Sequence, residues 1–301
     1  MGRDVKSPAR VNRLLAVTAR AAVLLVPLVL IAPALGQKRN DPCSAIQEFL
    51  ARAKRSLEND KEEQSLAEYN VIISKNPACA EAYMGRGIIF LRRQDHARAM
   101  ADFNKAVELD PRNKTTYMFR GFFFQKIKED RKAVADFTKN IELCTKNKDC
   151  SSTVYASRGE SYSKLQELDK AIEDFTKAIS IEPGDAETYH LRGLAYFRHK
   201  AQLTLALADV EKAISLDGTK GYYYRLRGSI LLLQRISEEK PSLVDAGLRD
   251  LSRAIELEPD EYKNYEVRAT MYRMIGETEK AAADQKKADD LKGKRFLQKS
   301  P

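Results

Sequence analysis

The segment AEAYMGRGIIFLRRQDHARAMADFNKAVELDP, residues 80–111, contains two amphipathic stretches joined by a short polar one. Tyr83, Gly87 and Phe90 recur in the first stretch at the spacing of a single helix face. Phe103 stands between two alanines at similar spacing in the second stretch, and a proline closes the segment. The pattern predicts an antiparallel pair of helices in which the rings of one helix cover the small residues of the other.

The same pattern recurs along the chain. The first stretches carry an aromatic ring at Phe49, Tyr83, Tyr117, Tyr155, Tyr189, Tyr224 and Tyr265. A small residue follows four positions later, at Ala53, Gly87, Gly121, Gly159, Gly193, Gly228 and Ala269. The second stretches carry a ring at Tyr69, Phe103, Phe137 and Phe175, a position that weakens to Val210, Leu251 and Gln285. This pattern, with 34 residues between Pro77 and Pro111, resembles the tetratricopeptide repeat and extends over residues 46–293.

The resemblance implies an all-α fold, a right-handed superhelical solenoid of about seven helix-turn-helix repeats. A single hairpin has too little core to be stable alone, and stacking of neighbours supplies the missing core. In arrays of this family the first helices line the inner face of the superhelix, where ligands usually lie. The resemblance therefore implies a non-enzymatic scaffold that binds a protein or peptide partner in a concave groove.

A basic and an acidic position also recur in every repeat. An arginine precedes the small residue, at Arg52, Arg86, Arg120, Arg158, Arg192, Arg227 and Arg268. An acid precedes the ring position of the second helix, at Glu68, Asp102, Asp136, Asp174, Asp209, Asp250 and Asp284. We expect a bidentate bridge between the two inside each hairpin, because the guanidinium fork matches a carboxylate. A group that every repeat carries belongs to the scaffold rather than to an anion-binding site.

The N-terminal residues 1–36 combine a basic lead with an apolar run that ends in small residues. This pattern predicts a secretory signal peptide, cleaved before Gln37, of the kind found in exported bacterial proteins. An uncleaved anchor is the alternative and would be the chain's one contact with a membrane. The chain then divides into an N-terminal lead at 37–45, the repeats at 46–293 and a basic tail at 294–301. Export would place the protein in the periplasm or outside the cell.

The four cysteines lie at the edges of the expected hairpins. Cys43 precedes the first helix of repeat one and Cys79 follows the second, so an antiparallel hairpin brings them to the same edge. Cys144 and Cys150 bracket the link between repeats three and four. Because an oxidising compartment lets thiols pair, we predict disulfides between Cys43 and Cys79 and between Cys144 and Cys150. A zinc site is the less favoured alternative, since the histidines lie far away in sequence.

Repeats five and six carry extra residues between their two helices. The longer insertion, in RISEEKPSLVDAG at 235–247, adds about seven residues. We expect both insertions to form loops at the edge opposite the link between Cys144 and Cys150. Leu291 is expected to complete the last helix and to pack on repeat seven, with the basic residues beyond it keeping the end of the array soluble.

Four positions of each first helix should face the inner groove when counted from the recurring ring. The residues that we expect to line a partner groove are Met84, Ile88, Leu91, Met118, Phe122, His190, Leu194, Phe197, Tyr222 and Arg225. Methionine and aromatic side chains suit adaptable contact with an extended or helical peptide. The alternative is that these residues pack one first helix against the next and are covered.

The sequence predicts no catalytic residue, cofactor or metal site, because it has only three histidines and no phosphate-binding glycine loop. Its net charge of +9 is mixed in sign along the chain, without a basic stripe interleaved with aromatics, which argues against nucleic acid. Two hypotheses remain. One is a binding module with its partner in the groove, and the other is a structural assembly factor of an envelope or secretion complex that uses its outer surface and edges.

Overall fold

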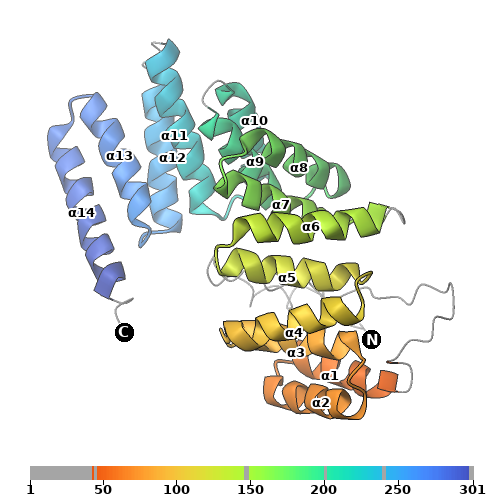
Figure 1. Ribbon diagram of the computed structural model, residues 1–301. Helices are drawn as coiled ribbons and strands as arrows, with labels where there is room; N and C mark the ends of the chain where they lie inside the picture. The colour runs from red at the N-terminus through yellow and green to blue at the C-terminus, as the bar shows by residue number, and fades with distance from the viewer. Residues whose placement is uncertain (1–42, 44–45, 146–148, 200–201, 239–241, 298–301) are drawn as a thin grey trace, which may run out of the picture. The chain divides into compact units, whose positions relative to one another are not determined.

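The computed structural model describes residues 43, 46–145, 149–199, 202–238 and 242–297 (Figure 1). Fourteen α-helices occupy the described ranges: α1 Gln47–Glu58, α2 Glu62–Lys75, α3 Ala80–Arg92, α4 His96–Leu109, α5 Lys114–Lys126, α6 Asp130–Thr145, α7 Ser152–Lys164, α8 Leu168–Ile181, α9 Ala186–Arg198, α10 Leu203–Leu216, α11 Gly221–Glu238, α12 Ser242–Leu257, α13 Tyr262–Met274 and α14 Thr278–Leu297. They fall into two compact units that divide after Pro111, so α1–α4 belong to the first unit and α5–α14 to the second.

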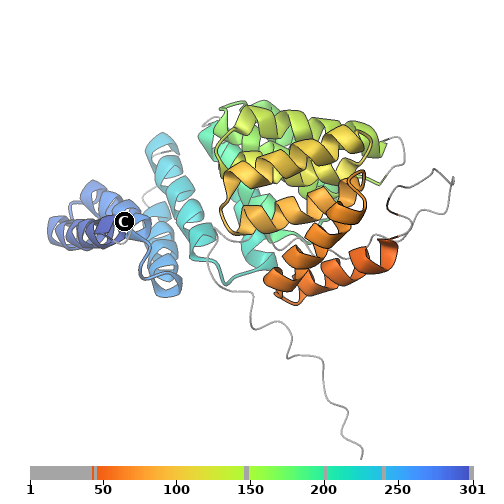
Figure 2. The same ribbon diagram turned by 60° about the horizontal axis from the view of Figure 1, so that its bottom comes forward.

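Each odd-numbered helix pairs with the helix that follows it, which gives the expected hairpins. In the segment 80–111, α3 ends at Arg92 and α4 begins at His96, so the turn falls in the predicted polar stretch. Within the second unit, α6 packs on α7, α8 on α9, α10 on α11 and α12 on α13. Figure 2 shows the last hairpin, α13 with α14, as two neighbouring helices. The all-α fold and its seven helix pairs are therefore confirmed.

The rings of the second helices lie against the small residues of the first helices, as the pattern predicted. A Cβ atom on Gly121 would lie 2.6 Å from Cε1 of Phe137, and one on Gly159 would lie 2.9 Å from the same atom of Phe175. Both phenylalanines are wholly buried. Glycine is thus required at these two places because the helices approach more closely than any side chain would allow.

The predicted bridge between arginine and carboxylate is present in all seven hairpins, with N–O distances of 2.6 to 2.8 Å. In the second to seventh hairpins, Nε and a terminal nitrogen of the arginine donate to the two oxygens of one aspartate. The first hairpin differs because Arg52 is 52% exposed at its side chain. The aspartates are buried, so these bridges are part of the packed interior.

Both predicted disulfides are formed. Cys43 is bonded to Cys79 in the first unit, with Cα atoms 5.2 Å apart. Cys144 is bonded to Cys150 in the second unit, with Cα atoms 5.1 Å apart. The zinc alternative therefore does not hold for these four thiols, since each sulfur is used in a covalent bond.

The insertion in repeat six does not form the expected loop. α11 continues to Glu238 and has 18 residues, compared with 13 in α9, and α12 has 16 compared with 14 in α10. The inserted sequence favours helix up to Pro241, because glycine and proline are absent from it before that point. The expectation of a long loop was wrong for this reason. The shorter insertion in repeat five falls partly on residues 200–201, outside the described ranges.

The chain ends are described only in part. Leu291 is buried with Tyr265 and Ala288, as predicted, and α14 continues into the stretch expected to be a tail. The predicted signal peptide at 1–36 lies outside the described residues. Among the helices that are described, none has the length and apolar character needed to cross a bilayer.

We expect Arg158→Ala to lower the free energy of unfolding by roughly 3 to 5 kcal/mol, because it leaves the buried carboxylate of Asp174 without its partner. The matched change Arg52→Ala should cost less than about 1 kcal/mol, since the Arg52 side chain is 52% exposed and Glu68 keeps a hydrogen bond from the amide of Gln64. Urea unfolding followed by circular dichroism measures both. Equal losses in the two variants would show that burial of the arginine side chain does not set the strength of the bridge.

Candidate functional site

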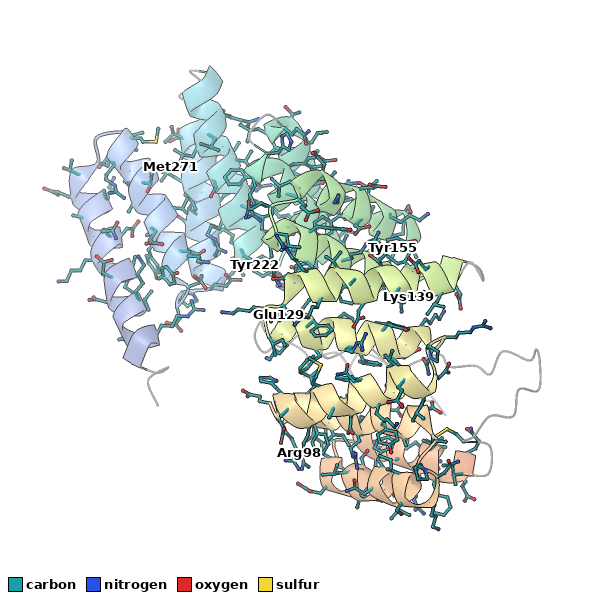
Figure 3. The ribbon with its side chains drawn as sticks, viewed as in Figure 1. Arg98, Glu129, Lys139, Tyr155, Tyr222 and Met271 are labelled. Carbon is teal, nitrogen blue, oxygen red and sulfur yellow. A yellow bond between two sulfur atoms is a disulfide. The ribbon has the colours of Figure 1, made fainter. Side chains whose placement is uncertain are left out.

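Polar and aromatic side chains gather where α9 meets α11 in the second unit. α9 starts after Asp185, whose carboxylate accepts a hydrogen bond from the backbone N–H of Glu187 and thereby caps the helix. Tyr222 and Tyr223 lie in the first turn of α11, where Figure 3 labels Tyr222. We call Glu187, His190, Tyr222 and Tyr223 the α9–α11 cluster.

Glu187 joins the two helices. The hydroxyl groups of Tyr222 and Tyr223 both donate to its Oε2 atom, at 2.6 and 3.2 Å. The residue as a whole is exposed. Desolvation of its carboxylate against the two rings still raises the pKa of Glu187 above its ordinary value, although both hydroxyl groups lower it. Burial and the nearby carboxylate raise the pKa of each tyrosine, so both phenols remain protonated donors.

His190 lies behind the tyrosines and is only 8% exposed. Its ring centroid is 4.9 Å from that of Tyr222 and 5.0 Å from that of Tyr223. The buried Nδ1 atom has no hydrogen-bond partner among the described residues. Burial, with a smaller contribution from the charge of Arg225, lowers the pKa of His190 to about 3. The imidazole is therefore neutral at physiological pH.

Arg225 follows Tyr222 by one helical turn and continues the polar surface toward α13. One terminal nitrogen donates to Oδ1 of Asn264 at 2.8 Å and lies 4.0 Å from an oxygen of Glu258. Burial lowers the pKa of Arg225, and the negative charges of Glu261 and Glu258 oppose that shift. Its contacts differ from those of the bridging arginines, which hold a carboxylate with two nitrogens at 2.6 to 2.8 Å.

Four residues expected in the groove are in the interior. Met84 and Ile88 are each 5% exposed, and Leu91 and Phe122 are each 2% exposed. Phe122 packs edge-on against Phe137, with ring centroids 5.4 Å apart. Their burial contradicts an open groove at these side chains and agrees with the alternative of covered packing residues.

The remaining predicted residues other than His190 are partly exposed: Met118, Leu194, Phe197, Tyr222 and Arg225. Leu194, Phe197 and Tyr222 pack at the margin of a buried core that α10 and α11 build. The structure thus brings the predicted residues of α9 and α11 into one region that combines apolar and polar side chains.

Tyr223 belongs to the α9–α11 cluster but was not predicted as a site residue, whereas Glu187 occupies one of the four positions of its first helix that should face the groove. The signal in the sequence was the run Tyr222-Tyr223-Tyr224, of which only Tyr224 fills the recurring ring position. Tyr222 was expected to face the groove, and Tyr223 had no role in the repeat pattern. The direction of these side chains depends on how α11 packs on α9, and the periodicity of the sequence does not predict that packing.

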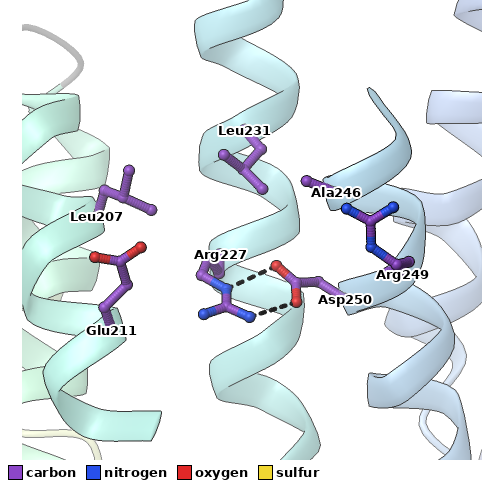
Figure 4. Close-up of a pocket in the computed structure, with 7 residues that line it drawn as sticks. All are labelled: Leu207, Glu211, Arg227, Leu231, Ala246, Arg249 and Asp250. Carbon is purple, nitrogen blue, oxygen red and sulfur yellow. Dashed lines mark hydrogen bonds and ion pairs between the residues drawn. The ribbon is translucent and has the colours of Figure 1, made fainter. Parts of the chain in front are cut away.

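A pocket of about 230 Å³ opens on the side of the second helices. Figure 4 shows the side chains that line it, which are Leu207, Glu211, Arg227, Leu231, Ala246, Arg249 and Asp250. Arg227 holds Asp250 through both carboxylate oxygens at the wall of this pocket. The pocket between α10, α11 and α12 therefore combines leucine side chains with charged ones.

The described residues contain no group of three or more histidine, cysteine or acidic side chains arranged to hold a metal ion. His96 is exposed at the start of α4, and His199 is exposed as the residue that caps the C-terminal end of α9. The geometry of the α9–α11 cluster is suited to hydrogen bonding and ring contact rather than to metal binding.

Comparisons with known proteins agree with the repeat pattern. Two tetratricopeptide repeat profiles match residues 45–114 and residues 152–185. A search of curated proteins gave no significant match.

Several solved structures share the fold at low sequence identity. The tetratricopeptide repeat protein YrrB, described as having an unusual peptide-binding site, is 19% identical with a TM-score of 0.54, over 65% of this chain and 95% of that one. Pseudomonas aeruginosa pilF is 16% identical with a TM-score of 0.64, over 76% and 99% of the two chains. A tetratricopeptide repeat protein from Parabacteroides merdae is 17% identical with a TM-score of 0.60, over 81% and 92%.

Acid should destabilise the protein through His190. The folded-state pKa of about 3 lies below the unfolded value near 6.5, so the unfolded chain alone takes up this proton as the pH falls below about 6.5. Between pH 7 and pH 5 the free energy of unfolding should fall by about 2 kcal/mol more in the wild type than in His190→Gln. Urea unfolding at the two pH values measures this difference. Identical losses would mean that His190 becomes protonated in the folded protein.

Proposed function

Because this chain is a tetratricopeptide repeat protein, we propose that it acts as a non-enzymatic scaffold that binds a peptide or protein partner along its first helices. The observation that carries the proposal is the surface formed by α9 and α11. There Leu194 and Phe197 remain partly exposed beside Tyr222 and Arg225. Partly exposed apolar side chains next to fixed donors and acceptors are what a peptide site needs for affinity and for register.

The similar structure of YrrB supports this proposal by its fold alone. YrrB is described as having an unusual peptide-binding site. Repeats of this kind can therefore present their helices to a peptide. Since the identity is 19%, the residues that would do so in this chain have to be argued from its own side chains.

The proposed surface is centred on the second unit. A partner at Met84, Ile88, Leu91 or Phe122 would have to displace packed neighbours, because these side chains are buried. Met118 on α5 remains partly exposed and would extend the surface of α9 and α11 toward the start of the second unit.

We further propose that the protein is exported to the periplasm or beyond. The basic and apolar pattern of residues 1–36 supports this location. The two disulfides also support it, because thiols pair stably in oxidising compartments.

A second candidate function is structural assembly through the outer surface and edges. The pocket between α10, α11 and α12 favours it, because Leu207, Leu231 and Ala246 form an apolar wall beside charged residues. Leu205 on α10 is 49% exposed and adds apolar surface on the same helix. A partner on this side would contact the second helices α10 and α12 together with the α11 side chains between them.

Site-specific photo-crosslinking distinguishes the two candidates. p-Benzoylphenylalanine placed at Phe197 keeps an aromatic ring in the first-helix surface, and the same residue placed at Leu205 probes α10. We expect an adduct of defined mass from position 197 in cells that produce the protein, and none from position 205. An adduct only at 205 would favour assembly through the second helices, and the absence of adducts at both positions would count against both surfaces.

Thiol labelling tests the proposed location. Protein isolated without reductant should show no alkylation by iodoacetamide at its four cysteines, and digestion should yield the peptides linked through Cys43–Cys79 and Cys144–Cys150. Reduction should destabilise the first hairpin by about 4 kcal/mol and the shorter loop by about 2 kcal/mol, on the chain-entropy account. Free thiols at all four positions in the isolated protein would contradict residence in an oxidising compartment.

A further inference from the structure

Glu187 is a carboxylate held in place without a cation. Its Oε2 atom accepts hydrogen bonds from two neutral phenols, those of Tyr222 and Tyr223. In the described part of the chain, no lysine, arginine or histidine forms an ion pair with it. The acids at the recurring bridge positions differ, since each has an arginine of its own hairpin within 2.8 Å.

The charged groups around Glu187 leave its negative charge uncompensated. Asp185 and Glu160 both act on it as like charges. His190 packs against both tyrosines that hold Glu187 and is neutral. Arg225 is engaged with Asn264 on α13. A positive charge would therefore be attracted to the exposed carboxylate.

The same cluster also contains a buried polar atom that has no hydrogen-bond partner among the described residues. His190 is more than nine-tenths buried, and its Nδ1 atom has no hydrogen bond within the described residues. Its ring contacts Tyr222 and Tyr223, the two residues that hold Glu187. Buried polar atoms usually have partners, so this unpartnered nitrogen indicates that the α9–α11 cluster is incomplete in the isolated chain.

We propose that Glu187 and Tyr222 form the receptor for a basic side chain, lysine or arginine, of the partner peptide. The inference rests on the proposed function and adds the chemistry of the partner to it. The cation pairs with the carboxylate of Glu187, a residue that is exposed as a whole, and lies against the partly exposed side chain of Tyr222. Both contacts favour a cation over a neutral side chain of the same shape.

The bonds from the tyrosines do not by themselves require a charge at position 187. A phenol also donates to the carbonyl oxygen of an amide, although less strongly than to a carboxylate, so Glu187→Gln can keep the link between α9 and α11. The same change removes the negative charge. The variant therefore distinguishes two roles of Glu187. It preserves a structural role in linking the two helices and removes the ability to bind a cation.

The test uses nuclear magnetic resonance of the ¹⁵N-labelled protein with two matched probes. Nα-Acetyl-arginine amide carries the positive charge, and Nα-acetyl-citrulline amide has nearly the same shape without it. We expect the arginine probe to shift the amide signals of Glu187, His190 and Tyr222, and the citrulline probe to leave them in place. Glu187→Gln should weaken binding of the arginine probe about three- to tenfold, and 0.5 M salt should weaken it in the wild type.

Glu173→Gln is the control, because Glu173 is an exposed acid on α8 without a tyrosine partner in the described residues. It should bind the arginine probe as the wild type does. Equal shifts by the two probes, or equal binding by Glu187→Gln and the wild type, would overturn the receptor. A partner crosslinked at position 197 together with either of those results would refute the receptor and leave the proposed function standing.

Discussion

The bridge between arginine and aspartate is the interaction on which the hairpins and their stacking both depend. Arg158 uses two nitrogens to hold Asp174 in its own hairpin and donates from the third to the hydroxyl of Thr138 in the preceding hairpin. Arg192 repeats this arrangement with Thr176 as the residue of the preceding hairpin. A planar guanidinium fixes these donors at set angles. One side chain thereby sets the geometry within a hairpin and its register against the neighbouring one.

The surroundings of the bridge explain why a charged pair is tolerated in a packed interior. The guanidinium of Arg192 lies 5.7 Å from the ring centroid of Tyr189 and 5.9 Å from that of Tyr196, so aromatic faces cover the cation where water is excluded. Hydrogen bonds satisfy both oxygens of the partner aspartate. A buried ion pair with all its hydrogen bonds made avoids most of the desolvation penalty of an unpaired charge. The same residues are therefore committed to the scaffold and are not free for a partner.

Periodicity in the sequence was enough to predict the helix pairs and the bridges, because each depends on residues at fixed separations within one hairpin. The disulfide pairing followed from where the cysteines stand at the edges of those hairpins. It failed at Met84 and Phe122, where exposure depends on how side chains pack in three dimensions. It also failed at the insertion before Pro241, where helix propensity outweighed the expectation that added residues form loops. The hydrogen bonds between Glu187 and the tyrosines of α11 join residues 35 and 36 positions apart in neighbouring repeats, and the repeat pattern does not predict them.

The cluster between α9 and α11 is informative because it departs from an otherwise regular scaffold. At each recurring bridge position an acid pairs with an arginine of its own hairpin. Glu187 is instead oriented by two phenols, which restrain its carboxylate without neutralising its charge. Restraint before binding lowers the side-chain entropy that is lost on association. A carboxylate whose charge is uncompensated also attracts an incoming cation more strongly than a carboxylate that is already paired. The carboxylate is tolerated in this position because the two phenols donate hydrogen bonds to one of its oxygens. Preorganisation and incomplete neutralisation together are what a recognition site on a rigid repeat scaffold requires.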